Sequence, residues 1–468
     1  MVKLATLSVK TKLTGTAMLL TTLLSGCAST IDQSQHQQEL QRLINEAQIA
    51  PQLAGQDEVN WWQKLHSSQL NQLVNDALAN NHNLHSSQLQ LQSALARLGS
   101  QKAQFLPQGG TEINASRNDI VDNNSRQLSA NLALDWQLDL FGRISALVDA
   151  ANASAMSRAE QLRLLQIEVV SSVVKGFVSY QGNKQKQQIV ELQVEALQQS
   201  IEVLQARVDE GIANELDLNR TRAQLSQQQA LLPEIAYAQY SDLTALAVLT
   251  GRLSSALVLQ DEQKVFDLPF NLTLAQPANA IALRPDISQA LFDFSEANSL
   301  SVSASKALLP EVSLSAFAGV LSLGSYGLAD TQGQWEVAPQ IKWSLLSYPA
   351  LLAQRDAQQY LSEAAYSDYQ QVVLNAISES ELALQLLVKE NEQQQYAQQR
   401  YKYANNAFLQ AEAMYQEGQI PYLELLNARQ DILIAQENSV DSTISTLLAK
   451  VNAYQAFNGR WSYALANL

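Results

Sequence analysis

Three segments of the chain alternate between apolar and polar residues and so predict β-strands. Their apolar positions are Leu128, Ala130, Leu132, Leu134, Trp136 and Leu138, then Val312, Leu314, Ala316, Ala318 and Val320, then Trp335, Val337, Ile341, Trp343 and Leu345. Because successive side chains of a strand point to opposite faces, each segment predicts one apolar and one polar face. A fainter alternation over 111–117 predicts a fourth strand.

Two far longer segments, 143–210 and 350–417, contain few residues that break a helix. The interior weak points of the first are Gly176 and Gly182. A helix of about 68 residues is about 100 Å long, so it cannot fold into a globular core by itself. We therefore expect each long helix to pack lengthwise against neighbours, as in a coiled coil.

A shorter helix is expected before each pair of strands, and a returning helix after each long one. The first short helix should run from about Leu70 to Gln104 and end before Pro107. We expect the first returning helix to kink at Pro233. The turns between long and returning helices contain Gly211 and Gly418, which are expected to adopt positive φ at a helix C-terminus.

The chain contains two copies of one unit. Residues 83–107 match 286–310 without a gap, at an offset of 203 (310 − 107). Trp136 matches Trp343 at an offset of 207, and the segment that begins at Glu210 matches the one that begins at Glu417 at the same offset. Landmarks so widely spread, at a nearly constant offset, indicate an internal duplication. Each copy is expected to contain a helix, a β-hairpin, a long helix, a turn and a returning helix.

These patterns divide the chain into five parts. We expect a signal peptide at 1–26, a lipid-bearing segment at 27–63, the first copy at 64–252, a linker at 253–280 and the second copy at 281–468.

The N-terminal segment has the features of a bacterial lipoprotein signal. Three lysines precede an apolar run at 13–24, which is too short to span a bilayer as a helix. The run ends in Leu24-Ser25-Gly26-Cys27, which resembles a lipobox. A stray buried cysteine is the weaker alternative, because the only cysteine of the chain lies at the position that a lipobox requires. We expect Cys27 to be lipidated, and Ala28 beside it is typical of sorting to the outer membrane.

The charge and composition exclude several classes of function. The formal net charge is −15, and removal of 1–26 takes away three lysines and no acids, giving −18 (−15 − 3) for the mature chain. Nucleic acid is not expected as a partner, because phosphate binding requires clustered Lys and Arg. One cysteine excludes a disulfide scaffold, and the four histidines show no metal-ligand spacing.

Enzyme motifs are weak or missing. Ser303-Ala304-Ser305-Lys306 fits the Ser-x-x-Lys pattern of penicillin-interacting enzymes, but the partner motifs of that class are absent from the sequence. No phosphate-binding glycine loop and no His-Glu-x-x-His motif occurs either. The sequence therefore predicts a protein that is not an enzyme, with no catalytic residues, no metal and no cofactor.

The four predicted strands have the length of membrane-spanning strands, about ten residues each. Unpaired strand edges are intolerable in hydrocarbon, so a membrane sheet must close into a barrel. Known spanning barrels have about eight strands or more, so four strands cannot close alone. We therefore expect several copies of the chain to share one barrel, with a barrel of helices beneath it. A soluble β-sandwich would show the same alternation and is the competing interpretation.

The ordered motifs of the chain resemble the TolC-like outer-membrane factor family, in its lipoprotein branch of tripartite efflux channels. Residues 136–143, Trp-Gln-Leu-Asp-Leu-Phe-Gly-Arg, look like the strand-to-helix signature of that family. Arg284-Pro285-Asp286-Ile287 is similar to its helix start, and Leu309-Pro310 to the junction before its next strand. Residues 422–429 resemble the segment after its periplasmic turn. The resemblance covers essentially all of 27–468.

This resemblance implies a mainly α fold with a transmembrane β-barrel. It implies a homotrimer whose 12-stranded β-barrel stands on a 12-helix periplasmic α-barrel, with duplicated helical hairpins and four strands per protomer. The implied partners are further copies of the chain, a periplasmic adaptor protein, an inner-membrane pump and outer-membrane lipids. The implied function is passive conduction of small toxic molecules out of the cell. Segment 27–63 would lie around the helical barrel, and 253–280 would form an equatorial segment.

The resemblance also assigns residues to a gate at the helical tips. Leu423, Glu424 and Asn427 occupy its second-copy gate positions, and Tyr415 and Asp217 occupy positions that can bond to each other across the gate. Many relatives have Asp where this chain has Asn427, so Glu424 is the better candidate for a charged ring, with Arg429 as its candidate salt-bridge partner. The tip turns at Gly211 and Gly418 would meet the adaptor. A solvated helix face explains Glu424 and Arg429 about equally well.

Two other functions stay open at this point. One is export of proteins, as in type I secretion, and the other is a periplasmic lipoprotein scaffold without a pore. The sequence does not name the substrate, the pump or the adaptor.

Overall fold

The computed structural model describes Arg42, Phe266 and residues 60–120, 123–262, 281–323 and 331–457. The predicted signal peptide, Cys27 and most of the predicted linker lie outside these residues. The elements from Trp61 onward belong to one compact unit, Ile44–Leu468. None of the described helices combines the length and apolar character needed to cross a membrane.

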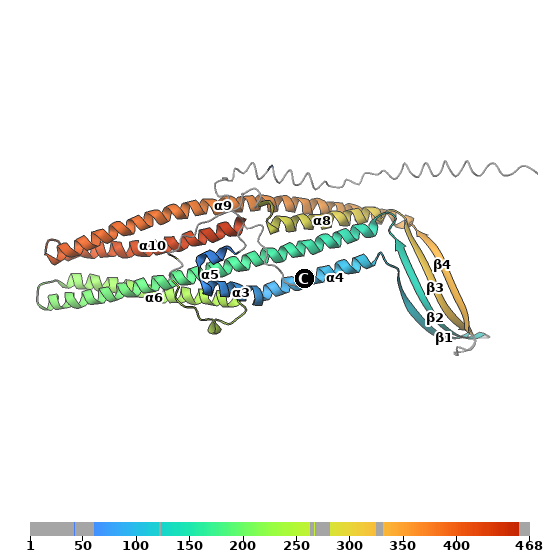
Figure 1. Ribbon diagram of the computed structural model, residues 1–468, viewed down its shortest axis with the longest axis horizontal. Helices are drawn as coiled ribbons and strands as arrows, with labels where there is room; N and C mark the ends of the chain where they lie inside the picture. Colours follow the sequence, from blue (N-terminus) through green and yellow to red (C-terminus); the bar gives the residue numbers. More distant parts are fainter. Residues whose placement is uncertain are drawn as a thin grey trace, which may run out of the picture. The chain divides into compact units, whose positions relative to one another are not determined.

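The described elements follow the expected order twice (Figure 1). They are η2 (Trp61–Leu65), α3 (Ser68–Asn80), α4 (His82–Ala103), β1 (Gln108–Ile120), β2 (Asn123–Leu138), α5 (Arg143–Asp209), α6 (Glu215–Leu249), η3 (Ser254–Ala256), α8 (Pro285–Lys306), β3 (Glu311–Leu323), β4 (Thr331–Lys342), η6 (Leu345–Ser347), α9 (Tyr348–Gln416) and α10 (Tyr422–Phe457). The strands lie at one end of the helices, and the turns of both helical hairpins lie at the other (Figure 1).

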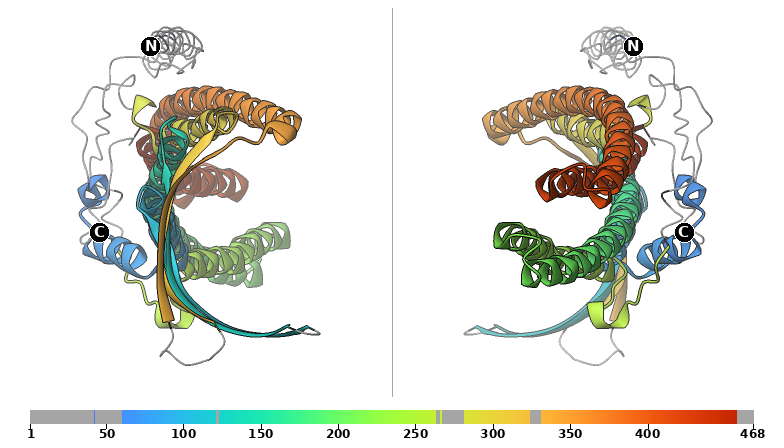
Figure 2. Two further views of the ribbon diagram at one scale, coloured as in Figure 1. Left: turned by 90° about the vertical axis from the view of Figure 1, so that its right-hand side faces the viewer. Right: turned by 90° about the vertical axis from the view of Figure 1, so that its left-hand side faces the viewer.

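The two long helices end within one or two residues of the predicted limits. α5 has 67 residues and α9 has 69, and each forms a hairpin with the helix that follows it. α8 packs on both α5 and α9, and α10 packs on α5, so the two copies lie side by side along their length. Seen end on, the helices form a curved layer (Figure 2). Pro233 lies inside α6, which continues through it as one helix.

The expected single helix from Leu70 to Gln104 is two helices, a prediction that was wrong. Asn81 has extended backbone angles between α3 and α4, and its side-chain oxygen accepts hydrogen bonds from the backbone N–H groups of Asn83 and Leu84 at 3.0 and 3.1 Å. Its amide nitrogen donates to the carbonyl of Leu249 at 3.0 Å. Asparagine can thus replace helical backbone bonds with side-chain bonds and start a new helix.

The two expected hairpins form one antiparallel sheet with the strand order β1-β2-β3-β4. Its strands have 12 to 16 residues, longer than the predicted ten. β2 and β3, which come from different copies, pair over their whole contact from Gln127↔Leu323 to Leu138↔Val312. β1 and β4 are therefore the free edges of the described sheet.

The duplication is visible in individual hydrogen bonds where the helices meet the sheet. The indole N–H of Trp136 donates to the carbonyl of Phe105 at 2.9 Å, and the indole N–H of Trp343 donates to the carbonyl of Leu308 at 3.2 Å. The tryptophans are 207 residues apart and the acceptors 203, as the sequence match requires. In both copies a tryptophan in or directly after a strand thus satisfies a carbonyl just after the preceding helix.

The start of α5 shows how the segment 136–143 turns a strand into a helix. Gly142, at φ 78°, is the N-cap, a conformation that glycine adopts without steric cost. The carboxylate of Asp139 accepts hydrogen bonds from the backbone N–H groups of Ile144 and Ser145 at 2.9 and 2.8 Å. Burial opposes ionisation of Asp139, but these bonds and one from the Ser145 hydroxyl bring its pKa below the usual value. The carboxylate therefore stabilises the first turn of α5.

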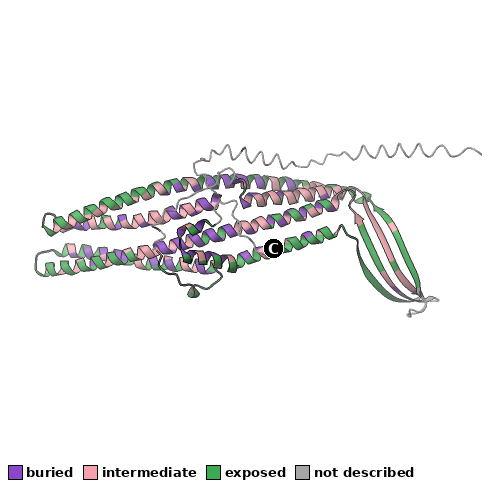
Figure 3. Cartoon of the chain, viewed as in Figure 1, coloured by how far each residue is buried: buried purple, intermediate pink, exposed green. Residues whose placement is uncertain are grey.

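Burial is concentrated in the middle of the helices, whereas the tips and strands are mostly half-buried or exposed (Figure 3). Phe177 and Val178 of α5 are fully buried. A Cβ on Gly182 would lie 2.3 Å from the Cδ1 atom of Ile444 on α10, and one on Gly176 would lie 3.1 Å from a methyl of Leu246 on α6. The two glycines thus allow both returning helices to approach α5 closely.

We predict that Gly182→Leu destabilises the fold by about 1–3 kcal/mol, because a bulky side chain has no room against α10. The melting temperature of the detergent-solubilised protein, followed by circular dichroism, should fall. Gly99→Leu is the matched control, since a Cβ on that α4 glycine meets no atom within 4 Å. Adding Ile444→Ala to Gly182→Leu should recover part of the loss. A double variant no more stable than Gly182→Leu would contradict the proposed contact.

Candidate functional site

The turns at the two helical tips have the same backbone structure. Gly211 and Gly418 adopt φ of 71° and 73°, which confirms the predicted conformation. The N–H of Ile212 donates to the carbonyl of Arg207 at 2.8 Å, and that of Gln419 donates to the carbonyl of Met414 at 2.8 Å. These bonds span five residues and close each helix in a Schellman motif, which needs a left-handed residue at the glycine position.

Two side-chain hydrogen bonds connect the hairpins next to these turns. Arg207 on α5 donates to the hydroxyl of Tyr415 on α9 at 2.7 Å, and its guanidinium carbon lies 5.5 Å from the centre of that ring. The hydroxyls of Thr221 on α6 and Tyr422 on α10 are 3.0 Å apart. The rings of Tyr415 and Tyr422 meet edge to face with centroids 5.4 Å apart. The four residues, which we call the tip latch, hold the tip of one copy to the tip of the other.

Burial raises the pKa of the Tyr422 phenol, while the hydrogen bond with Thr221 and the charge of Arg429 act in the opposite direction. The phenol is thus kept protonated, and it can donate or accept within the tip latch.

Tyr415 and Asp217 do not bond to each other within the protomer. The backbone carbonyl of Asp217 accepts from the hydroxyl of Thr221 at 2.9 Å, and its carboxylate lies 3.9 Å from Arg220 on the next turn of α6. The partner of Tyr415 inside the chain is instead Arg207, which the sequence did not single out. Nothing in the spacing identifies Arg207, because the tip latch joins residues that are not equivalent in the two copies.

The predicted gate residues Leu423, Glu424 and Asn427 all have exposed side chains near the start of α10. Leu425 and Leu426, which lie between Glu424 and Asn427, are buried. The face of α10 that carries the three gate residues is therefore turned away from the neighbouring helices. Glu424 lies in the first turn, where a negative charge is favourable. One protomer thus presents a leucine, a carboxylate and an amide together on one open face.

Arg429 does not pair with Glu424 in this chain. Its guanidinium donates to the hydroxyl of Ser200 on α5, and its central carbon lies 5.5 Å from the centre of the Phe408 ring on α9. Arg429 therefore connects α10 to both neighbouring long helices. Its positive charge does not form an ion pair with the Glu424 carboxylate.

A groove runs between α9 and α10 further from the tip. It is lined by Tyr396, Gln399, Arg400, Tyr403, Ala404, Ala407, Ala428 and Asp431. The side chains of Tyr396 and Tyr403, one heptad apart, are mostly exposed. Aromatic residues beside small ones on a helix surface are typical of a helix-packing site.

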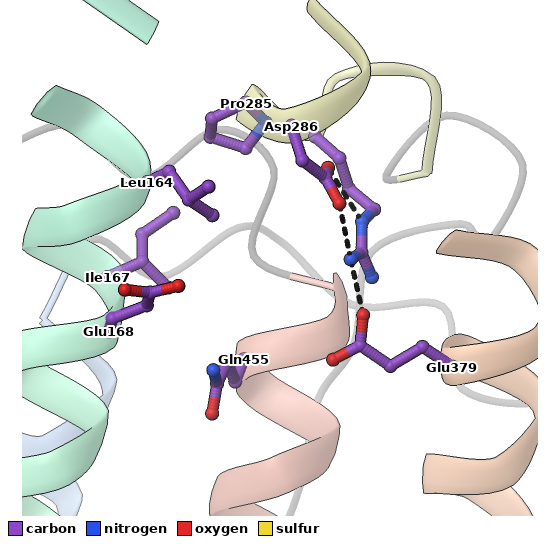
Figure 4. A pocket seen from close by; sticks show the side chains of 8 residues that line it. Leu164, Ile167, Glu168, Pro285, Asp286, Glu379 and Gln455 are labelled. Atoms are coloured by element: carbon purple, nitrogen blue, oxygen red, sulfur yellow. Dashed lines mark hydrogen bonds and ion pairs between the residues drawn. The ribbon is translucent and has the colours of Figure 1, made fainter. Parts of the chain in front are cut away.

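A polar cluster around the buried side chain of Arg284 lies far from the tips, where α8 begins. Arg284 donates to Asp286 at 2.8 Å, to Glu379 at 2.6 Å and to the carbonyl of Ala456 at 3.0 Å, and both carboxylates point toward its guanidinium (Figure 4). A cavity of about 140 Å³ lies beside them, with Glu168 of α5 on its opposite wall. The motif Arg284-Pro285-Asp286-Ile287 thus joins α8, α9 and α10 at one point.

The charges of this cluster influence two side chains of the first copy. Burial raises the pKa of Glu168, and the negative charges of Glu379 and Asp286 raise it further. Burial lowers the pKa of Lys175, partly offset by Glu379, and its ammonium donates to Gln455 at 2.8 Å. These bonds connect helices from both copies, so we assign the cluster a structural role.

The described residues contain no group of three or more His, Cys, Asp or Glu side chains that could hold a metal ion. The hydroxyls of the Ser-x-x-Lys segment are bonded to backbone carbonyls, since Ser303 donates to that of Arg143 on α5 at 3.5 Å and Ser305 to that of Ser301 at 3.0 Å. The features that remain for function are the tips, the groove and the open sheet.

Comparison with known proteins agrees with this architecture. The model of the outer membrane efflux protein family matches residues 73–252 and 277–459, in two separate stretches. The toluene efflux pump outer membrane protein TtgC of Pseudomonas putida is 28% identical over 425 residues, covering 86% of each chain. The cation efflux system protein CusC of Escherichia coli O6:H1 is 27% identical over 407 residues, covering 84% of this chain and 86% of that one. The structure of the outer-membrane channel OprN has the same fold, with a TM-score of 0.80 at 24% identity over 89% of this chain and 96% of that one. The chain belongs to the outer membrane efflux protein family.

Proposed function

We propose that the chain is the exit duct of a tripartite efflux system, which conducts small toxic molecules across the outer membrane without catalysis. An inner-membrane pump supplies the energy, and a periplasmic adaptor joins the pump to the tips of this chain. The similarity to TtgC, named for toluene efflux, supports small organic molecules as cargo.

The observation that carries this proposal is the open sheet. Its edge strands β1 and β4 have no partner strand within the described chain, and large apolar side chains such as Trp335 and Ile341 are exposed on β4. Such a sheet is stable in hydrocarbon only when closed into a barrel, and four strands are too few to close. Three copies supply twelve strands, and the long helices of the same copies extend the duct into the periplasm.

We predict that the Cys27→Ser variant, which cannot be lipidated, stays with outer membranes after high-salt and carbonate washing. A spanning barrel holds the protein there without the lipid, whereas a peripheral scaffold would be held by the lipid alone. The measurement is the fraction of protein that sediments with washed membranes, with the unsubstituted chain as control. The purified protein should also conduct ions in planar bilayers. Complete extraction of the variant, together with an absence of conductance, would contradict the proposal that the chain forms a duct.

We further propose that the duct is gated at the tips by Leu423, Glu424 and Asn427. Their exposure on one protomer supports a position where sister chains and the pore meet. Three symmetry-related Glu424 carboxylates in a narrow pore would attract cations and repel one another. With Arg429 bonded to Ser200, this repulsion would not be neutralised from within the chain.

Replacing Glu424 with Gln should lower the preference of the open channel for cations over anions, because the pore loses three negative charges. The measurement is the reversal potential in planar bilayers under a salt gradient. The control is Glu381→Gln, which removes an exposed carboxylate of α9 far along the helix from the tip. Equal selectivity in the Glu424→Gln and unsubstituted channels would rule out the charged ring.

The tip latch gives the gate its resting position in this proposal. Opening would separate the two hairpins and so break the bonds of Arg207 with Tyr415 and of Thr221 with Tyr422. The adaptor, docked at the turns of Gly211 and Gly418, would stabilise the separated arrangement.

The variant Tyr415→Phe should open more readily, because it keeps the ring but loses the hydroxyl that accepts from Arg207. A hydrogen bond of this kind contributes about 0.5–1.5 kcal/mol, equivalent to an increase of about two- to tenfold in the open-to-closed ratio. Single-channel recording measures that ratio. Tyr403→Phe is the matched control on the same helix, where the hydroxyl accepts only a weak bond from Gln399 at 3.4 Å. If both variants gate alike, the tip latch has no part in opening.

A further inference from the structure

The strand register divides the described side chains of the sheet between two faces. One face carries every described strand residue whose large apolar side chain is exposed, namely Ile113, Leu132, Leu134, Trp136, Trp335, Val337 and Ile341. The other face, which we call the polar face, includes Glu112, Asn131, Asp135, Gln137, Gln334 and Gln340. A membrane barrel turns its apolar face to lipid and its polar face to the lumen. In the proposed duct, passing molecules therefore meet the polar face.

Phe317 is an exception on the polar face. Among the described strand residues of that face it has the one aromatic side chain, and it is half-buried. It lies directly opposite Ala133 on β2 and Glu336 on β4. Its neighbours on the same face of β3 are Ser315 and Gly319, two residues away in either direction. The ring therefore stands among small side chains, with one carboxylate beside it.

A hollow of about 470 Å³ lies on the sheet at this ring, and we call it the Phe317 hollow. Its lining includes Gly110, Ala133, Asp135, Ser315, Phe317 and Glu336. A Cβ added to Gly110 would meet no atom within 4 Å, so the space above this glycine is open. The small residues of β1 and β2 thus form a low floor, and the ring of Phe317 forms a wall.

The charges at the Phe317 hollow have one sign. Asp135 and Glu336 are among its lining residues, and none of the lining residues is Lys or Arg. Both carboxylates are exposed, and they come from β2 and β4, the two strands that flank β3. The face of an aromatic ring and a carboxylate both attract a cation. An anion of the same shape would be repelled by the carboxylates.

We propose that the Phe317 hollow binds organic cations on their way through the duct. The apolar body of the molecule lies against the ring of Phe317, and its positive charge faces Asp135 and Glu336. This inference rests on the proposed duct, and it names a class of molecule that the lumen of the duct retains.

The exposure of these groups makes the site a weak one. Water competes for both carboxylates, and a cation over an exposed ring is held less strongly than one in a dry pocket. A conducting path requires such weakness, because a molecule that enters must also leave. The proposed Glu424 ring would attract any cation. The Phe317 hollow adds an apolar contact, which favours cations that have an organic body.

The test is block of the ion current through the full-length, lipidated protein in planar bilayers. The probe is tetraphenylphosphonium, and the control is tetraphenylborate, an anion of nearly the same size and shape. Tetraphenylphosphonium should reduce the current at concentrations at which tetraphenylborate does not. Equal block by the two ions would overturn the proposed preference for cations.

Replacing Phe317 with Ala should raise the concentration of tetraphenylphosphonium that halves the current by about two- to thirtyfold, the range of a cation–π contact. The matched control is Leu321→Ala, which truncates a large apolar residue of the polar face four residues further along β3. Equal block in the Phe317→Ala and unsubstituted channels would place the cation elsewhere, such as at Glu424, and would overturn the inference.

A second variant fills the Phe317 hollow and keeps the ring. Gly110→Leu places a bulky side chain in the open space on β1, and it should weaken the block by tetraphenylphosphonium several-fold. Thr111→Leu is the control, because it adds a similar side chain to the opposite face of the same strand. If these two variants are blocked alike, the hollow is not the binding site.

The contribution of the charges is measured with Asp135→Asn combined with Glu336→Gln. This double variant should lose most of its preference for tetraphenylphosphonium over tetraphenylborate. Glu112→Gln removes a carboxylate of the polar face that does not line the hollow, and it should change the preference less. A channel that conducts ions, and whose block none of these variants alters, overturns this inference and leaves the duct standing. A protein that does not conduct contradicts the duct and this site with it.

Discussion

α5 lies against α3, α4, α6, α8 and α10, and this lengthwise packing is the interaction on which the described fold depends. A helix of 67 residues has no core of its own, so its apolar residues must be buried by neighbours along its whole length. In its central part, around Phe177, most side chains are buried, and the stripe that contains Glu168 and Ser172 stays exposed. Gly176 and Gly182 allow α6 and α10 to come close enough to complete that burial.

The packing around α5 also determines which parts of the single chain are left without neighbours to bury them. Burial fades toward the tips and toward the strands, the two regions where family membership implies contacts with sister chains and partner proteins. At the sheet, the unsatisfied backbone groups of β1 and β4 impose the stricter condition, because hydrocarbon offers them no alternative donor or acceptor. At the tips, water can satisfy exposed groups, so contacts there can break and form again. The same chain can therefore have a permanent junction at one end and a reversible one at the other.

The duplication makes the halves alike in backbone and different in side-chain contacts. Both copies have an indole hydrogen bond after the first helix and a Schellman turn at the tip. Asp139, however, caps α5 in the first copy, whereas the equivalent residue of the second copy is the fully exposed Leu346, and α9 begins with Pro349 in its first turn. The tip latch likewise joins non-equivalent residues. The repeat is therefore preserved in the backbone, while the polar side-chain contacts differ between the two copies.

The sequence by itself determined the order of the elements, the ends of α5 and α9 to within two residues, and the left-handed turns at Gly211 and Gly418. These features depend on local periodicity and on backbone angles that few residues tolerate, and both can be read from the chain directly. The tertiary structure alone decided the break at Asn81, the register in which β2 and β3 join the two hairpins, and the partners of Tyr415 and Arg429. Each of these rests on contacts between residues distant in sequence and not equivalent in the repeat. Hydrogen bonds of that kind depend on where packing around α5 places the side chains. A local sequence pattern does not contain that information.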